Sequence, residues 1–248
     1  MPENSIDMIF ADPPYMLSNN GFTCKNGKMA PVNKGSWDKS GGFENDTMFH
    51  DEWIRACRRV LKPGGTIWIS GTYHSIYQCG YLLQKNNFHI LNDIAWFKPN
   101  APPNLSCRFF TASHETLIWA KKDKKAKHVF NYELMKDGSF PEDKLKKEKS
   151  QMRSVWSIPS PAKAEKKEGK HPAQKPLALL TRIIYASTAE NGIVLDPFNG
   201  GGTTGLACAG AGRFYIGMET DPSYCALTVK RLSSRAEQAD AGVGCFFP

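Results

Sequence analysis

The sequence predicts an α/β fold with a mostly parallel sheet and helices on both faces. Short apolar runs recur along the 248 residues, as strands buried in a parallel sheet require. Segments with apolar residues at helical spacing separate these runs, so strands and helices alternate. Asp12, Asp196 and Glu219 each follow such a run, and ligands of these sheets bind outside the carboxyl ends of the strands. If their strands are neighbours, we expect the three acids to outline one site.

The first predicted strand, Ile6–Ala11, ends at Asp12-Pro13-Pro14-Tyr15, because proline has no backbone N–H with which to extend a sheet ladder. A long loop rich in Gly, Asn and Lys follows, and its later part carries Trp37 and Asp38. Helical spacing and short apolar runs predict the next elements in order: a helix over Phe49–Leu61, a strand over Thr66–Ser70, a helix over His74–Asn86, and strands over Ile90–Phe97 and His114–Lys121.

Residues from about 122 to 170 show poor periodicity and high polarity, so we expect an insertion packed on a single domain that spans residues 1–248. The chain has a net charge of +8, and residues 121–170 carry 15 Lys and Arg against 8 Asp and Glu. Such a surplus is typical either of a solvated surface or of a surface that binds a polyanion. The remaining elements are a helix over Pro176–Thr188, a strand over Gly192–Asp196, a helix over Thr203–Gly210, a strand over Arg213–Glu219, a helix over Pro222–Glu237 and a disordered tail over 238–248.

Composition excludes several classes of protein. No apolar run approaches the roughly 18 residues that a membrane span requires, and the first residues carry acids where a secretory signal has a basic region. The seven cysteines form no metal-like CxxC pair, which indicates reduced thiols, no metal site and a cytoplasmic protein.

A glycine loop follows the strand that ends at Asp196. Gly200, Gly202 and Gly205 give the spacing GxGxxG, with Glu219 nineteen positions after Gly200. This pattern alone is typical of dinucleotide-binding proteins. Asp196 argues against a nicotinamide dinucleotide, because a carboxylate in the first turn would repel a pyrophosphate. An adenosine joined to an amino acid, with its ammonium on Asp196 and its ribose on Glu219, fits every part, and S-adenosylmethionine is such a molecule.

Asp12-Pro13-Pro14-Tyr15 suits chemistry on the exocyclic amine of a nucleobase. That nitrogen is a poor nucleophile because its lone pair is delocalised into the ring. A carboxylate from Asp12 and the fixed carbonyl of Pro13 can accept its two N–H bonds and aim its lone pair at a methyl donor. The ring of Tyr15 can stack on a base extruded from the double helix.

The segments ADPPY, VLKPGGTIWIS, HETLIWAKK, HPAQKP and DPFNGGGTTG, in this order, resemble the β class of DNA amino-methyltransferases. The resemblance covers nearly the whole chain and implies a Rossmann-like S-adenosylmethionine-dependent methyltransferase fold with permuted motif order. It places target recognition in the basic insertion, and the aspartate of the catalytic motif suggests adenine N6. The segments SCRFFTASHETLIWAKK and KGSWDK are similar to the Dpn-type second adenine methylases, which act on GATC.

The resemblance also implies roles for individual residues. The catalytic motif is Asp12, Pro13, Pro14 and Tyr15. Residues expected at the cofactor are Asp196, Phe198, Gly200, Gly202, Thr203, Glu219 and Lys175. Lys175, in the segment HPAQKP, is expected at the carboxylate of the cofactor. Phe198, in the segment DPFNGGGTTG, is expected on its adenine. Residues expected at DNA are Trp37, Arg108, Lys144, Lys146, Lys147 and Lys149.

Two features depart from the β-class pattern. Gly201 replaces the serine of the usual GSG, which removes a hydroxyl and loosens the loop. Relatives also place a strand and a helix before PENSIDMIFADPPY, whereas Met1 begins inside that region here. We therefore expect either a fragment truncated at the N-terminus or a sheet that lacks one strand beside the cofactor.

The leading hypothesis is methyl transfer from S-adenosylmethionine to the N6 amine of adenine in DNA. Cytosine N4 and an RNA base are alternatives with the same amine chemistry, and a catalytically impaired DNA-binding relic is an alternative of another class. The expected partner is DNA, and no association with a membrane is expected. A homodimer and a cognate restriction endonuclease are further partners that the resemblance leaves open.

Overall fold

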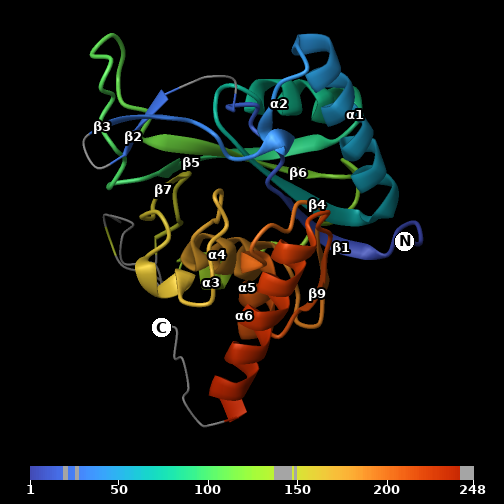
Figure 1. Cartoon of the computed structure of the whole chain (residues 1–248). Coiled ribbons are helices and arrows are strands. Elements are labelled where there is room, and N and C mark those ends of the chain that lie inside the picture. Colours follow the sequence, from blue (N-terminus) through green and yellow to red (C-terminus); the bar gives the residue numbers. More distant parts are fainter. Residues whose placement is uncertain (19–21, 26–27, 137–146, 148–149, 241–248) are drawn as a thin grey trace.

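A computed structural model describes the chain except residues 19–21, 26–27, 137–146, 148–149 and 241–248, and it describes only the backbone of 22–25 and 238–240. A sheet of seven strands crosses the molecule in the order β7-β5-β6-β4-β1-β8-β9 (Figure 1). The strands are β1 (Ile6–Ala11), β4 (Leu61–Gly71), β5 (His89–Phe97), β6 (His114–Lys121), β7 (Val155–Ser157), β8 (Ile193–Asp196) and β9 (Phe214–Gly217). Strand β6 runs antiparallel to β4 and β5, and the other neighbouring pairs of this sheet are parallel. The predicted α/β fold with a mostly parallel sheet is confirmed.

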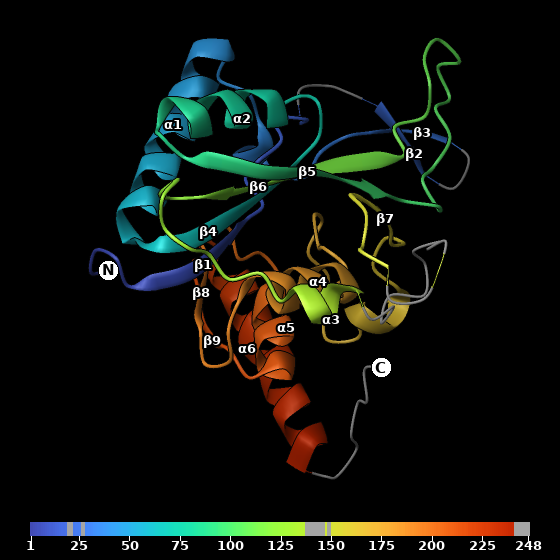
Figure 2. The same ribbon diagram turned by 180° about the vertical axis from the view of Figure 1, so that it is seen from behind.

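Helices cover both faces of the sheet, as Figure 2 shows from behind. Helices α1 (Phe43–Val60) and α2 (Ile76–Lys85) lie on one face. Helices α4 (Leu177–Ser187) and α5 (Thr203–Ala211) lie on the other, where α6 (Pro222–Asp240) packs against α5 and the short α3 (Tyr132–Lys136) packs against α4. In the described part of the chain, no helix is long and apolar enough to cross a membrane.

Two hydrophobic cores hold these layers together. Side chains alternate between the faces of a strand, so Ile9 and Ala11 pack toward α1 and α2, whereas Met8 and Phe10 pack toward α4 and α5. These four side chains are at most 2% exposed. Because both faces of β1 are buried, its residues form a continuous apolar run, which is the pattern that identified the strand.

The first half differs from the prediction in three places. Strand β4 begins at Leu61, five residues before the predicted start at Thr66. Helix α1 begins at Phe43, six residues before the predicted start, because the Asp46 carboxylate accepts hydrogen bonds from Ser40 Oγ at 2.5 Å and Gly41 N at 2.9 Å. Phe43 and Met48 in this early part are exposed, so apolar spacing could not reveal it. The long loop contains the antiparallel pair β2 (Phe22–Lys25) and β3 (Lys28–Pro31), and a 3-10 turn at Ser36–Asp38.

The second half also differs in two places. The basic insertion supplies an edge strand of the main sheet, since β7 pairs with β5 in parallel. A 3-10 turn, Lys163–Lys166, follows it. The predicted disordered tail over 238–248 is wrong for residues 238–240, because α6 extends to Asp240. The rest of that tail lies outside the described residues.

Candidate active site

The order of the strands brings the predicted acids to one edge of the sheet. Asp12 follows β1, Asp196 ends β8, and Glu219 follows β9, and these three strands are neighbours. All three strands are parallel, so their carboxyl ends meet at the same edge. A pocket opens there between the proline motif and the glycine loop, lined by Asp12, Pro13, Asp196 and Gly200 among others.

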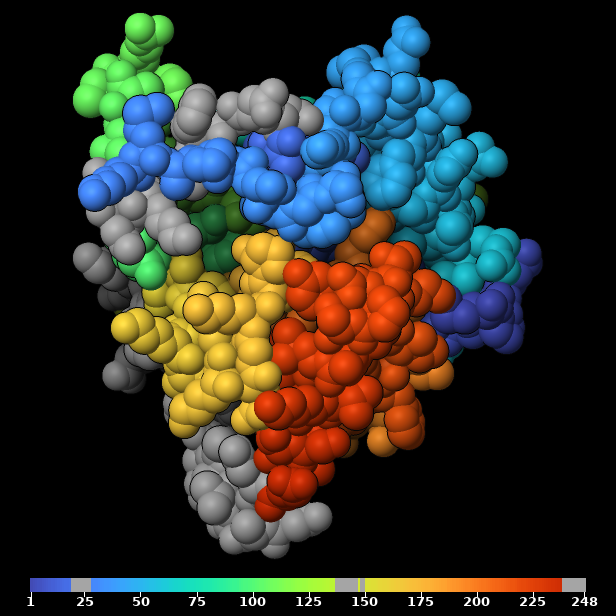
Figure 3. Space-filling view, in the orientation of Figure 1, coloured from blue at the N-terminus to red at the C-terminus, as the bar shows by residue number. Residues whose placement is uncertain are grey.

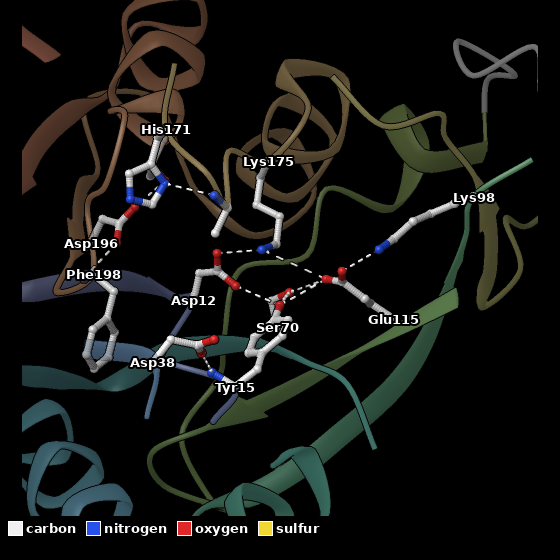
Figure 4. Close-up of polar contacts among 12 residues, drawn as sticks. Asp12, Tyr15, Asp38, Ser70, Lys98, Glu115, His171, Lys175, Asp196 and Phe198 are labelled. Atoms are coloured by element: carbon white, nitrogen blue, oxygen red, sulfur yellow. Dashed lines mark hydrogen bonds and ion pairs between the residues drawn. The ribbon is translucent and has the colours of Figure 1, made fainter. Parts of the chain in front are cut away.

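Asp12 is held by two donors (Figure 4). Its Oδ2 lies 2.5 Å from the ammonium of Lys175, and its Oδ1 accepts a hydrogen bond from the Tyr15 hydroxyl at 2.7 Å. The side chains of Asp12 and Lys175 are 13% and 8% exposed. Burial alone would lower the pKa of Lys175, but Asp12 and Glu115 outweigh it and raise that pKa. Lys175 therefore keeps its proton although it is buried.

Asp38 fixes the backbone that follows the proline motif. It is fully buried, and its Oδ1 accepts a hydrogen bond from Tyr15 N at 3.0 Å while its Oδ2 accepts one from Ser18 Oγ at 2.8 Å. The sequence marked Asp38 as part of a long loop and gave it no role. The contact shows that this loop returns to the motif and sets the position of Tyr15.

Glu115, Ser70 and Lys98 extend the charged cluster beneath Tyr15. The Tyr15 hydroxyl lies 2.7 Å from Ser70 Oγ and 2.9 Å from Glu115 Oε2, and the Lys98 ammonium pairs with Glu115 Oε1. Burial raises the pKa of Glu115, but Lys175 and Lys98 outweigh it and hold the value at about 2. Burial, Asp12 and Glu115 together raise the pKa of Tyr15 well above its usual value, so its hydroxyl keeps its proton.

Sequence reasoning missed Glu115 because β6 is antiparallel, and it missed Ser70 and Lys98 because no motif marks these two strand ends. Glu115 is the second residue of β6, and the start of an antiparallel strand lies at the same edge as the ends of its parallel neighbours. Ser70 is near the end of β4, and Lys98 directly follows β5. The strand HETLIWAKK was visible in the sequence, but its direction was not.

The glycine loop has the backbone that its sequence predicts. Gly200 and Gly202 have φ of +52° and +73°, a region that favours glycine. A Cβ on Gly200 would lie 3.0 Å from the ring of His171, and a Cβ on Gly202 would lie 2.5 Å from Thr228 Cγ2. Thr203, 6% exposed, begins α5 and lines the pocket. The loop is therefore closely packed and presents backbone toward the pocket.

Asp196 is a buried carboxyl group whose charge is poorly stabilised. Burial raises its pKa to about 7, although hydrogen bonds from Thr204 Oγ1 at 2.5 Å and Phe198 N at 3.0 Å act in the opposite direction. It is 3% exposed and lines the pocket. A cation bound in the pocket would meet a carboxyl group that ionises readily near neutral pH.

The other expected cofactor residues lie in the same pocket or on the loop beside it. Phe198 lines it and packs edge-on against Trp53, with ring centroids 5.3 Å apart. Glu219 is directed to the loop itself, since its Oε2 accepts a hydrogen bond from Gly200 N at 2.8 Å. Lys175, expected at a cofactor carboxylate, instead has its ammonium on Asp12.

The expected DNA-binding residues are spread more widely. Trp37 lines the pocket and stacks near His171 with centroids 6.0 Å apart, so it lies beside the cofactor region. Arg108 is exposed in the connection between β5 and β6, and Lys147 is exposed in the insertion. Three further predicted residues, Lys144, Lys146 and Lys149, lie outside the described residues. Among the residues that the structure describes, no group of three or more His, Cys, Asp or Glu side chains could hold a metal ion.

Comparison with known proteins identifies the family. Residues 6–230 match the model of the N6 and N4 methyltransferase family, described as DNA methylase. The chain belongs to this DNA methylase family. It is 52% identical over 229 residues to the type II methyltransferase M2.MboI of Moraxella bovis, which covers 92% of this chain and 81% of that protein. It is 49% identical over 238 residues to the type II methyltransferase M2.DpnII of Streptococcus pneumoniae, and the matched region covers 96% of this chain and 86% of that protein.

A solved structure shows that this DNA methyltransferase shares the fold of a related methyltransferase. The M1.HpyAVI–SAM complex superposes with a TM-score of 0.66 at 32% identity, over 92% of this chain and 88% of that one. The β-class resemblance and the methyltransferase fold predicted from the sequence are thereby confirmed. Glu115, Ser70 and Lys98 add a buried polar cluster to the site that the motifs marked.

Proposed function

We propose that this methyltransferase transfers a methyl group from S-adenosylmethionine to the exocyclic N6 amine of adenine in DNA. The observation that carries the proposal is the position of Asp12-Pro13-Pro14-Tyr15 at the end of β1, facing the glycine loop after β8 across one pocket. A group that accepts amine hydrogens thus lies beside a loop suited to a nucleoside cofactor.

The residues of the pocket fit S-adenosylmethionine. Gly200 and Gly201 line the pocket without side chains, so the cofactor can approach the backbone closely, and Gly202 keeps the turn packed against Thr228. Asp196 offers a buried carboxylate to the ammonium of the amino-acid part, and Phe198 offers a ring to the adenine. Glu219, which accepts from Gly200 N, lies next to the loop where it can also meet ribose hydroxyls. When bound, the cofactor supplies an electrophilic methyl group on a sulfonium.

Asp12 and the Pro13 carbonyl accept the two N–H bonds of the target amine. This contact draws the nitrogen toward tetrahedral geometry and stabilises the positive charge that develops on it. Asp12 does not deprotonate the neutral amine, whose pKa is far too high, and the proton leaves after attack. Tyr15 holds Asp12 through its hydroxyl and offers its ring face to the extruded base.

A duplex in which only the target adenine is altered tests the choice of base. We propose GATC as the first sequence to test, from the similarity to the Dpn-type second methylases. Labelled methyl transfer to a GATC duplex should vanish when purine, which lacks the amine, replaces the adenine of the site in both strands. Transfer that persists on the purine duplex would instead indicate cytosine N4. Binding of DNA without any transfer would indicate the catalytically impaired relic.

We also propose the wider organisation of the protein. Residues 1–248 form one catalytic domain, and the insertion from about 122 to 170 contacts DNA; the pairing of β7 with β5 supports its attachment to the main sheet.

The exposed Tyr77 and Tyr81, one turn apart on α2, offer a surface on which a second copy can form a homodimer. The type II names of the relatives support a cognate restriction endonuclease, and a substrate of cellular DNA supports a cytoplasmic location.

A further inference from the structure

Lys175 occupies the acceptor that the target amine needs. Its ammonium lies 2.5 Å from Asp12 Oδ2, while the Tyr15 hydroxyl holds Asp12 Oδ1. An amine that binds Asp12 and gains positive charge there is repelled by a cation already bound to the same carboxylate. Since Lys175 is 8% exposed, its ammonium cannot simply exchange Asp12 for water, and an unpaired buried charge would be strongly destabilising.

Glu115 is a second carboxylate within reach of the same ammonium. Its Oε2 lies 3.9 Å from Lys175 Nζ, so a shift of about one ångström would complete a direct ion pair. Ser70 Oγ donates to Glu115 Oε2 at 3.3 Å, and Lys98 pairs with Oε1, so this carboxylate is fixed in place. Because its pKa is held at about 2, Glu115 is ionised throughout the neutral range.

There is space on the Glu115 side of Lys175. A second pocket adjoins the cofactor pocket and is lined by Tyr15, Lys98, Glu115 and Lys175. In Figure 3 a hollow opens between the blue segment before α1 and the yellow segment before α4, with green residues at its floor. The two pockets share Tyr15 and Lys175, so Lys175 lies at their boundary.

We propose that Glu115 is a positioning residue that receives the ammonium of Lys175 when the target amine takes its place on Asp12. This inference rests on the proposed function. Lys175 then keeps a carboxylate partner in both states, and Asp12 becomes free to accept the amine hydrogens. Glu115 acts on the base through Lys175 and does not need to contact it.

Glu115→Gln tests the role, because the amide keeps the shape of the side chain but carries no charge with which to form an ion pair with the ammonium. Glu133→Gln is the matched control, since Glu133 forms an exposed ion pair with Lys136 on α3. Entry of the base is followed by the fluorescence of 2-aminopurine placed next to the target adenine, which keeps its N6 amine and unstacks from the probe as it enters, with S-adenosylhomocysteine present so that no transfer occurs. The KM for DNA and the Kd of the cofactor are measured beside it.

We expect Glu115→Gln to raise the KM for DNA at least tenfold and to reduce the fluorescence rise by a similar factor, with the cofactor Kd changed less than twofold. Glu133→Gln should match the wild type. Lys175→Met removes the competing cation, so adding Glu115→Gln to it should change base entry less than twofold. Glu115→Asp keeps the charge and should recover most of the fluorescence rise, which also provides a test if Glu115→Gln does not fold.

Two results would overturn the role of Glu115. One is a Glu115→Gln enzyme that matches Glu133→Gln, and the other is an equal loss of base entry with and without Lys175→Met, which would indicate a structural role. Failure of the proposed function looks different, because the wild-type enzyme would then transfer no methyl group to adenine.

Discussion

Replacing Asp12 by Asn should remove most of the methyl transfer while leaving the protein folded and bound to DNA. The amide keeps the shape of the side chain but loses the charge that faces the developing cation. Two unit charges about 3 Å apart interact by about 5 kcal/mol at an effective dielectric constant of about 20. The ammonium of Lys175 stays near Asp12 even when it is paired with Glu115 and offsets part of this, so we expect a loss of about 3 kcal/mol in the transition state. That corresponds to a fall in kcat of roughly 100-fold or more.

The fold should tolerate this change because Lys175 retains Glu115 at 3.9 Å. We expect a lower melting temperature and a cooperative transition. Asp93→Asn, at an exposed position of β5, is the control for loss of one negative charge. Single-turnover transfer of labelled methyl and DNA binding by fluorescence anisotropy are measured on both variants. A parallel loss of DNA binding and transfer, or a kcat within fivefold of the wild type, would refute the role of Asp12 in the transition state.

Three further perturbations test other parts of the site. The pKa of Asp196 is raised to about 7, so its contribution to stability is present below about pH 4 and is lost as the pH rises through 7. Cofactor affinity, measured by calorimetry, should rise over the same upper range as the carboxylate forms, and Asp196→Asn should abolish that rise; a flat profile in the wild type would contradict the pairing with an ammonium. Gly202→Ala should cost about 1–3 kcal/mol in urea unfolding and weaken cofactor binding, more than Gly212→Ala, whose φ is also positive but whose Cβ would meet nothing within 4 Å; equal costs would mean that the contact with Thr228 can relax. Changing Lys147 to Gln, and likewise Lys144, Lys146 and Lys149, should lower the salt dependence of DNA binding by about one unit of slope for each phosphate that is no longer neutralised, and an unchanged slope would make the run a solvated surface.

The sequence predicted the edge of the sheet that carries the site, because the relevant signals are local. Proline after Asp12 ends β1, and positive φ at Gly200 and Gly202 requires glycine. Each signal depends on a few adjacent residues. The strand order then brought Asp12 and Asp196 to neighbouring strands, as the parallel pattern implied.

The remaining part of the site depends on the direction of one strand and on the path of one loop. Glu115 reaches Tyr15 because β6 runs antiparallel, and alternation of apolar residues does not specify direction. Asp38 reaches Tyr15 because a loop of more than twenty residues returns to the motif, and such long-range contacts leave no periodic signal. Lys175 pairs with Asp12 although the two residues are far apart in the sequence, so no local pattern could reveal this ion pair.

The most direct test of the central claim is transfer of labelled methyl from S-adenosylmethionine to unmethylated bacterial DNA, followed by digestion to nucleosides. The geometry of Asp12-Pro13-Pro14-Tyr15 beside the glycine loop predicts that the label is recovered as N6-methyladenine, and that Asp12→Asn recovers roughly 100-fold less. Label in N4-methylcytosine, or an Asp12→Asn enzyme as active as the wild type, would contradict it.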